Sequence, residues 1–178
     1  STPKHLYNAL PKKVSKRRAG LIETTIDKLP QITCWKKDGG PFITLPIVYT
    51  EDVEQPGWMK SNMGMYRIQM GGNDYHQNEE IGLHYQIHRG IGVHQSKANA
   101  KGQPLKVSVF VGGPPSLSFS AVMPLPEGLP ELAFAGMLGG KRIRYFLEDG
   151  YTVCADADFV ITGEVMPHDV KPEGPFGD

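Results

Sequence analysis

The chain has 178 residues, 39% of them hydrophobic, and its 19 basic side chains balance 19 acidic ones. This hydrophobic content excludes a disordered chain, and zero net charge gives no electrostatic basis for binding nucleic acid or an anionic membrane. No apolar stretch approaches the length of a membrane span, and the basic N-terminus lacks the apolar run of a signal peptide. We therefore expect a cytoplasmic globular protein with no transmembrane segment. Cys34 and Cys154 are expected as reduced thiols, with one disulfide as the alternative.

The N-terminal segment, residues 1–30, differs in character from the rest. A basic run over residues 12–18 precedes apolar and β-branched side chains that recur at helical spacing, at Leu21, Ile22, Thr25, Ile26 and Leu29. We predict a solvated helix here, with its apolar stripe packed on the body. A nucleic-acid or lipid surface is the less favoured alternative, because the run is short and the chain is neutral.

From residue 31 onward, glycine and proline are interleaved with β-branched and aromatic runs, a pattern typical of short strands joined by tight turns. The strands predicted in chain order are 32–35, 42–49, 64–70, 83–88, 105–111, 142–147, 151–155 and 159–165. Pro46 indicates an edge or a bulge in the second of these. A helix is predicted over 129–138 with Gly139 and Gly140 as its stop, and 96–102 is read as the end of another. The expected fold is mainly β with some α, a barrel or folded sheet with short helical additions.

Arg67 is the first candidate for chemistry, because it interrupts an apolar alternation. It is either a surface cation or an inward-facing guanidinium that needs carboxylate partners. Glu173 and Asp178, five residues apart around a Gly-Pro-Phe-Gly turn, are suitable partners, since an arginine–carboxylate pair is planar and often bidentate. Two carboxylates on a stiff loop can divide into a charged partner and a proton donor. For Asp178 the structural alternative is a turn-capping carboxylate.

A second group of candidates has the chemistry of metal ligands. His84 and His88 lie four apart, on one face of a predicted strand, although ordinary hydrogen-bonded histidines are the simpler interpretation. Glu131 falls in the first turn of a predicted helix, where it either complements the helix dipole or binds a divalent ion, and Glu127 is its nearest competitor. The sequence contains no dinucleotide-binding, P-loop or serine-hydrolase motif.

Four blocks, in one order, resemble the UbiD-type decarboxylases, which use prenylated FMN. They are residues 62–67, 87–90, 122–140 and 173–178, and the last matches the family's terminal Glu-Gly-Pro-Phe-Gly-acid block almost letter for letter. The resemblance covers most of residues 30–178, and family members are considerably longer. It implies a prenylated-FMN-binding split β-barrel domain over residues 31–178, similar to flavin-reductase barrels, in a chain that lacks the family's C-terminal domain.

The resemblance also implies a site. Asn62, His88 and Glu131 would hold Mn²⁺ or Mg²⁺ against the flavin phosphate, with His84 as the alternative to His88 and K⁺ as a further candidate ion. The residues implied to bind the cofactor are Asn62, Met63, Gly64, Met65, Arg67, Met123 and Pro124.

Arg67, Glu173 and Asp178 would be the catalytic set. Arg67, held by Glu173, would orient the substrate, and Asp178 would return a proton to the carbon that loses CO₂.

The function implied is non-oxidative decarboxylation of an aromatic or α,β-unsaturated carboxylic acid through a covalent adduct on prenylated FMN, with a place in quinone biosynthesis. The expected partners are the small carboxylic acid substrate, further copies of the full-length chain in a homo-oligomer, and a flavin prenyltransferase that supplies the cofactor. Two alternatives stay open: an FMN-dependent oxidoreductase on the same barrel, and a non-catalytic fragment.

Overall fold

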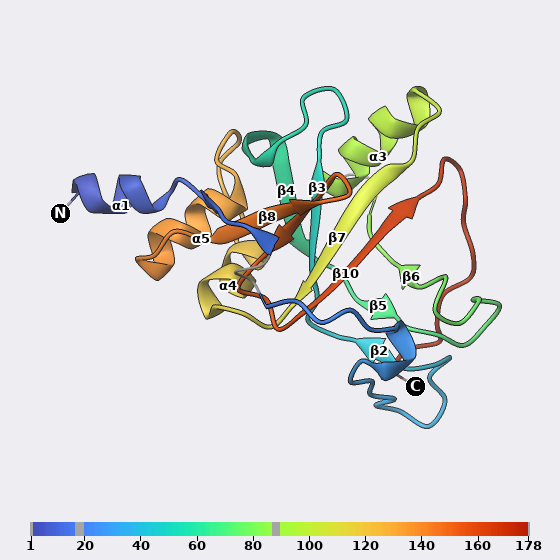
Figure 1. Cartoon of the computed structure of the whole chain (residues 1–178). Coiled ribbons are helices and arrows are strands. Elements are labelled where there is room, and N and C mark those ends of the chain that lie inside the picture. Colours follow the sequence, from blue (N-terminus) through green and yellow to red (C-terminus); the bar gives the residue numbers. More distant parts are fainter. Residues whose placement is uncertain (1, 17–19, 87–89, 178) are drawn as a thin grey trace.

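The structure, a computed structural model, describes residues 2–16, 20–86 and 90–177. Its centre is a four-stranded antiparallel sheet with the strand order β10-β7-β3-β4 (Figure 1). These strands are β3 (Ile47–Glu51), β4 (Ser61–Met65), β7 (Leu105–Val111) and β10 (Phe159–Val165).

Two smaller sheets flank this centre. One has the order β1-β8-β9, in which β1 (Lys12–Lys13) pairs in parallel with β8 (Arg144–Glu148), and β8 pairs antiparallel with β9 (Tyr151–Cys154). The other has the order β2-β5-β6, formed by β2 (Phe42–Ile43), β5 (Ile68–Gln69) and β6 (Gly82–Leu83). The described strands thus lie in three sheets and close no barrel, and the architecture is mixed α and β with sheets dominating.

The α-helices are α1 (Thr2–Asn8), α3 (Gly90–Ala100), α4 (Pro115–Val122) and α5 (Glu131–Gly139). Short 3-10 helices occupy Ile26–Lys28 and Trp58–Lys60. Within the described part of the chain, no helix combines the length and the apolar character that crossing a bilayer requires.

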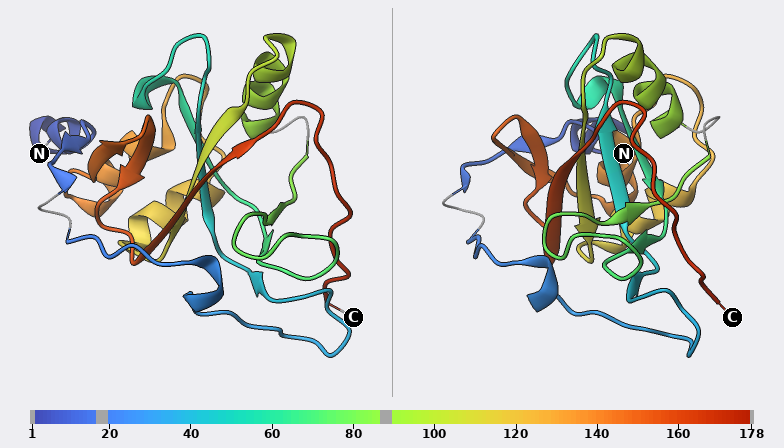
Figure 2. Two further views of the ribbon diagram at one scale, coloured as in Figure 1. Left: turned by 45° about the vertical axis from the view of Figure 1, so that its right-hand side comes forward. Right: turned by 90° about the vertical axis from the view of Figure 1, so that its right-hand side faces the viewer.

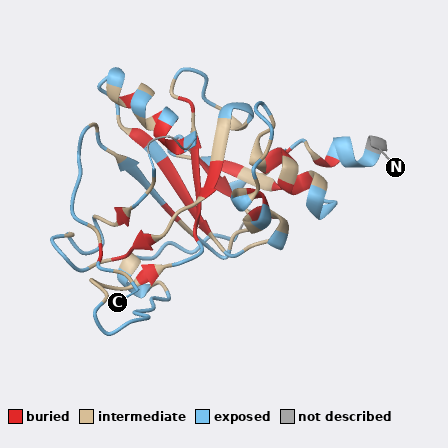
Figure 3. Ribbon diagram, turned by 180° about the vertical axis from the view of Figure 1, so that it is seen from behind, coloured by how far each residue is buried: buried red, intermediate tan, exposed pale blue. Residues whose placement is uncertain are grey.

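The inner strands β3 and β7 bury side chains on both faces of the central sheet, whereas the edge strand β10 is mostly exposed (Figure 3). Ile47 and Phe110 belong to one core cluster, which also contains Leu117 of α4 and Leu132 of α5. The opposite cluster contains Val48, Val107 and Val109 of the sheet, Ile91 and Ala98 of α3, and Ile68 and Met70 near the small sheet. The central sheet is therefore covered by α4 and α5 on one side and by α3 on the other.

Several predicted elements are confirmed. The strands β7 and β10 have the predicted bounds, and α5 ends where Gly140 adopts a left-handed backbone with φ 64°. The strand predicted over 42–49 is divided into β2 and β3, and Pro46 lies in the interruption. The strand predicted over 64–70 is likewise divided, because β4 pairs with β3 of the central sheet whereas β5 pairs with β2 of the small one.

Other predictions are wrong. Residues 21–29 form no α-helix but one 3-10 turn. Ile26 and Leu29 pack against a core cluster, whereas Leu21 is 44% and Ile22 90% exposed, so only part of the apolar stripe gains the burial that would stabilise a helix. Of the strand predicted over 32–35, only Ile32 forms an isolated bridge, to Phe42. The strand predicted over 83–88 reduces to β6, with residues 87–88 outside the described part. Helix α4, which follows the glycine-proline turn, was not predicted at all.

Candidate functional site

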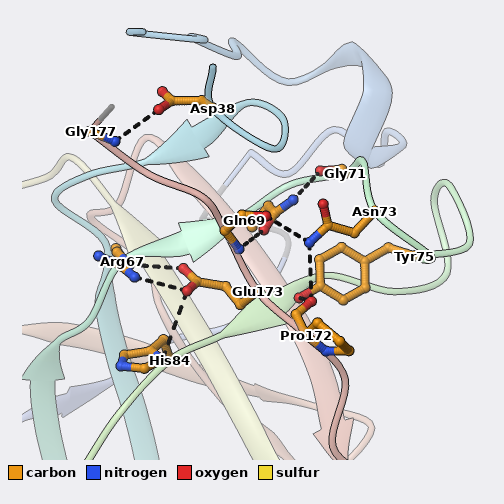
Figure 4. A network of polar contacts seen from close by, with 11 residues as sticks. Asp38, Arg67, Gln69, Gly71, Asn73, Tyr75, His84, Pro172, Glu173 and Gly177 are labelled. Carbon is orange, nitrogen blue, oxygen red and sulfur yellow. Dashed lines mark hydrogen bonds and ion pairs between the residues drawn. The ribbon is translucent and has the colours of Figure 1, made fainter. Parts of the chain in front are cut away.

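Arg67 and Glu173 form a bidentate ion pair (Figure 4). Arg67 lies in the interruption between β4 and β5, and its Nε and Nη2 donate to Oε1 and Oε2 of Glu173 at 2.8 and 2.9 Å. The Glu173 side chain is only 10% exposed, whereas that of Arg67 is 38% exposed. Hydrogen bonding to the carboxylate raises the pKa of Arg67, so the guanidinium is a permanent cation. The pair therefore presents one partly open cation backed by a buried anion.

Two further side chains border this pair. Nδ1 of His84 lies 3.8 Å from Oε2 of Glu173, and the His84 side chain is 61% exposed. The Arg67 guanidinium carbon lies 5.2 Å from the centroid of the Phe176 ring, which itself packs on Phe42 at a centroid distance of 4.6 Å. The guanidinium is thus oriented by a carboxylate at one edge and an aromatic ring at one face.

Glu173 belongs to an extended segment, residues 172–177, which we call the C-terminal strap. After β10 the chain runs without regular structure back to the β2-β5-β6 sheet (Figure 2). There the main-chain amide of Gly39 donates to the carbonyl of Pro175 at 2.9 Å, and Asp38 accepts from the amide of Gly177 at 2.9 Å. A Cβ on Gly39 would lie 2.2 Å from the Gly174 carbonyl oxygen, so only glycine permits this approach.

Glu131 contacts β4 at the residue after Asn62, at the far end of that strand from Arg67. Oε2 of Glu131, the first residue of α5, accepts from the main-chain amide of Met63 at 3.1 Å. Burial raises the pKa of Glu131. Asn62 packs against the start of α3, since a Cβ on Gly90 would lie 2.0 Å from its Oδ1. Its Nδ2 is buried and has no hydrogen-bond partner among the described residues.

A desolvated carboxylate beside a buried amide with an unused polar atom fits a bound polar group. Rotating the Asn62 amide by half a turn would present its oxygen at the same place, and amide and carboxylate oxygens suit Mn²⁺ or Mg²⁺. Within the described residues, no three His, Cys, Asp or Glu side chains cluster as a metal site. The predicted set does not require such a cluster, because it combines an amide with His88, which lies outside the described part.

The structure bears on the remaining predicted residues to different degrees. His88 and Asp178 lie outside the described residues, so the metal and proton-donor roles predicted for them stay predictions. Met63 is 2% exposed and belongs to a core cluster, and the cofactor contact predicted for it stays a prediction. The ring of Tyr66 occupies the position where a Cβ of Gly64 would project, at 2.3 Å from its hydroxyl oxygen, so in this structure Gly64 makes room for Tyr66.

Of the other predicted cofactor contacts, Met65 and Met123 are half-buried and Pro124 is exposed. Glu127 is exposed whereas Glu131 is half-buried, which favours Glu131 as the ligand of the two.

Sequence reasoning missed the polar side chains of residues 69–75 that bind the main chain of the strap (Figure 4). One signal was available: Gln69 stands two residues after Arg67, the spacing of side chains on one face of an extended segment.

Comparison with known proteins gives consistent results. The family model described as UbiD, 3-octaprenyl-4-hydroxybenzoate carboxy-lyase Rift-related domain, matches residues 11–178. A Chlamydia pneumoniae protein, named as one of the subunits of 4-hydroxybenzoate decarboxylase, is 43% identical over 160 residues, which cover 89% of this chain and 26% of that protein. An uncharacterized protein of Chlamydia trachomatis is 42% identical over 156 residues, 86% of this chain and 26% of that protein.

Solved structures agree. The vanillic acid decarboxylase of Sedimentibacter hydroxybenzoicus in its closed form superimposes with a TM-score of 0.82 at 29% identity, covering 100% of this chain and 41% of that chain. A UbiD-class enzyme of Pelotomaculum thermopropionicum in complex with prFMN shares the fold, with a TM-score of 0.81 at 24% identity, covering 99% of this chain and 42% of that one. The chain spans about a quarter of the length of the curated relatives. The chain belongs to the UbiD family, because the family model accounts for residues 11–178 and the relatives are similar over most of its length.

Proposed function

We propose that this chain is the cofactor-binding part, residues 31–178, of a longer lyase that releases CO₂ from an aromatic or α,β-unsaturated carboxylic acid. The observation that carries the proposal is the bidentate pair of Arg67 and Glu173, a half-open cation fixed by a buried carboxylate. Such a cation suits the recognition of a substrate carboxylate. Two similar proteins are named for the decarboxylation of 4-hydroxybenzoate and of vanillic acid, which favours a hydroxybenzoate-type substrate.

Arg67 has the donors for this role. Two of its five N–H groups bind Glu173 in the described structure, and the remaining N–H groups of the guanidinium are free to orient an anionic substrate. Glu173 keeps the guanidinium in place and balances its charge. Asp178 would return the proton to the carbon that loses CO₂, which requires a carboxyl group that is protonated when it acts.

Asn62, His88 and Glu131 would hold Mn²⁺ or Mg²⁺, with K⁺ as a further candidate ion. The metal would neutralise the phosphate of the cofactor and so help to anchor it in a chain with no net positive charge. When bound, prenylated FMN supplies the electron sink that decarboxylation needs. Met63, Gly64, Met65, Met123 and Pro124 are the residues we propose to line its ring system, and Asn62 and Arg67 complete the proposed cofactor-binding set.

Further aspects of the proposal rest on family membership. They are the split-barrel description of the domain, a homo-oligomeric complete enzyme, a flavin prenyltransferase as cofactor supplier, a cytoplasmic location and a place in quinone biosynthesis.

The test is to reconstitute the complete enzyme with prenylated FMN and Mn²⁺ and to measure CO₂ release from 4-hydroxybenzoate and vanillate. Arg67→Ala and Asp178→Asn should each lower release about 10²-fold or more, and full activity in both variants would reject the roles given to these residues. The mass of the flavin that copurifies with the enzyme, measured before any reconstitution, decides between the alternatives. Unmodified FMN with electron transfer and no CO₂ would indicate an FMN-dependent oxidoreductase, and absence of both flavin and metal would indicate a non-catalytic part.

A further inference from the structure

Polar side chains of β5 and of the loop that follows it bind the main chain on both sides of Glu173. Nδ2 of Asn73 donates to the carbonyl of Pro172 at 3.1 Å and to that of Gly174 at 2.9 Å. The main-chain amide of Gly174 donates to Oε1 of Gln69 at 2.8 Å. The carbonyl before Glu173, and both the amide and the carbonyl of the residue after it, therefore have side-chain partners (Figure 4).

Arg67 and Gln69 together fix the register of the strap. They stand two residues apart in one extended segment and bind two consecutive strap residues, Glu173 through its carboxylate and Gly174 through its amide. If the strap slid by one residue, both sets of bonds would break at once. The strap therefore has one favoured position relative to the guanidinium.

The amide of Gln69 is itself fixed. Gln69 is 0% exposed, and its Nε2 donates to the carbonyl of Gly71 at 2.9 Å while its oxygen accepts from Gly174. Turning the amide around would leave a buried donor facing a donor and a buried acceptor facing an acceptor, which is costly. The acceptor for the strap is thus set in advance by the fold.

Tyr75 adds a second donor to the same point. Its hydroxyl group donates to the carbonyl of Pro172 at 3.0 Å, so that carbonyl receives bonds from both Asn73 and Tyr75. Asn73 adopts a left-handed backbone with φ 47°, which turns the loop so that its side chain faces the strap. These polar groups bind the main chain around Glu173 rather than its carboxylate.

We propose that Gln69, Asn73 and Tyr75 are positioning residues that set where the Glu173 carboxylate stands, and through it the orientation of Arg67. The inference rests on the proposed function, because it assigns a consequence for turnover. A displacement of about 1 Å in a reacting constellation can lower the rate about a hundredfold. Loosening the strap should therefore lower kcat. KM should stay nearly unchanged, because the charge that attracts the substrate is still present.

Two conservative variants test this in the complete enzyme. Asn73→Gly removes the two donated bonds and keeps a residue that tolerates φ 47°, and Tyr75→Phe removes only the hydroxyl. The matched control is Asn78→Gly, an exposed position in the same loop with φ 66°, whose side chain accepts from the amide of Asp27 and not from the strap. Gln69→Met is the most direct change but risks misfolding, because the carbonyl of Gly71 and the amide of Gly174 would lose their side-chain partner.

The readouts are kcat and KM for CO₂ release, and hydrogen–deuterium exchange of the peptide that contains residues 172–177. For Asn73→Gly and Tyr75→Phe we expect faster exchange in that peptide, kcat lower by about tenfold or more, and KM within about twofold of the original. Asn78→Gly should match the unmodified enzyme in all three quantities.

Three results would overturn the inference: unchanged exchange in both variants, faster exchange with unchanged kcat, or an equal loss in Asn78→Gly. If the unmodified enzyme releases no CO₂ from any acid tried, the proposed function fails. The exchange measurement still decides in that case whether these side chains hold the strap.

Discussion

Replacing Arg67 should lower the stability of the protein more than replacing its partner Glu173. Arg67→Met would leave the carboxylate of Glu173, 10% exposed, without its counter-charge, whereas Glu173→Gln leaves a guanidinium that is 38% exposed and can bind water. Breaking a fully buried pair costs roughly 3–5 kcal/mol, and exposed pairs contribute about 0–1 kcal/mol. For this intermediate case we expect Arg67→Met to cost about 2–3 kcal/mol and Glu173→Gln about 1 kcal/mol.

The assay is a double-mutant cycle on the complete enzyme, with urea-induced unfolding and CO₂ release measured for each variant. A second pair provides the control, because Arg144 and Asp156 have similar exposures of 39% and 14% and are joined at 2.5 and 2.9 Å. Arg144→Met and Asp156→Asn should show a comparable asymmetry in stability and leave kcat unchanged. Variants of Arg67 or Glu173 should lower kcat about 10²–10³-fold, the usual loss when a charge-stabilising group is removed.

Two outcomes would refute this reasoning. If Glu173→Gln destabilised the protein more than Arg67→Met, then burial of the carboxylate would not control the energetics of the pair. If the Arg144 and Asp156 variants lost kcat to the same degree, the loss at Arg67 would reflect general destabilisation rather than a role in the site.

Three further predictions concern other parts of the molecule. Glu131→Gln should weaken Mn²⁺ binding at least about tenfold in calorimetric titration, while the exposed control Glu127→Gln should leave it unchanged. Burial lowers the pKa of His94 below its ordinary value of 6.5, so below pH 6.5 the unfolded chain binds a proton that the folded chain excludes. Stability should therefore fall as the pH falls from 6.5 toward the folded pKa, by up to about 1.4 kcal/mol per pH unit, and His94→Gln should flatten that part of the urea-unfolding profile. Gly39→Ala should lower stability by about 1–3 kcal/mol in urea unfolding, because its Cβ would meet a strap carbonyl at 2.2 Å, whereas Gly71→Ala, with open space around it, should cost little.

The parts of the fold that could be predicted are those where local pattern and burial agree. Residues 105–111 are rich in β-branched side chains, and as β7 they lie in the centre of the sheet between β3 and β10. The helix α5 combines an apolar run with a glycine stop, and its end follows the prediction. Residues 21–29 have the helical spacing, but only Ile26 and Leu29 pack on the core while Leu21 and Ile22 are exposed, and spacing with so little burial was not sufficient.

The site was predictable only where its chemistry required a partner. A guanidinium in an apolar context needs a carboxylate, and that requirement led from Arg67 to Glu173 across more than a hundred residues. The contacts of Gln69 and Asn73 with the strap carry no such chemical requirement, because any polar side chain can bind a main-chain group, and the spacing of Gln69 from Arg67 indicates only a shared face. Only the folded chain reveals which main-chain groups come within reach.

One short segment explains why the two halves of the candidate site appear together in the sequence. β4 carries Asn62 near its start, next to Glu131, and the chain leaves the central sheet just before Arg67, next to Glu173. An extended chain advances about 3.3 Å per residue, so the five residue steps from Asn62 to Arg67 separate the two halves by roughly 16 Å. This strand acts as a rigid spacer, buried in the sheet by its pairing with β3. A single contiguous block of sequence can therefore encode both the end that would hold the metal and the end that would meet the substrate.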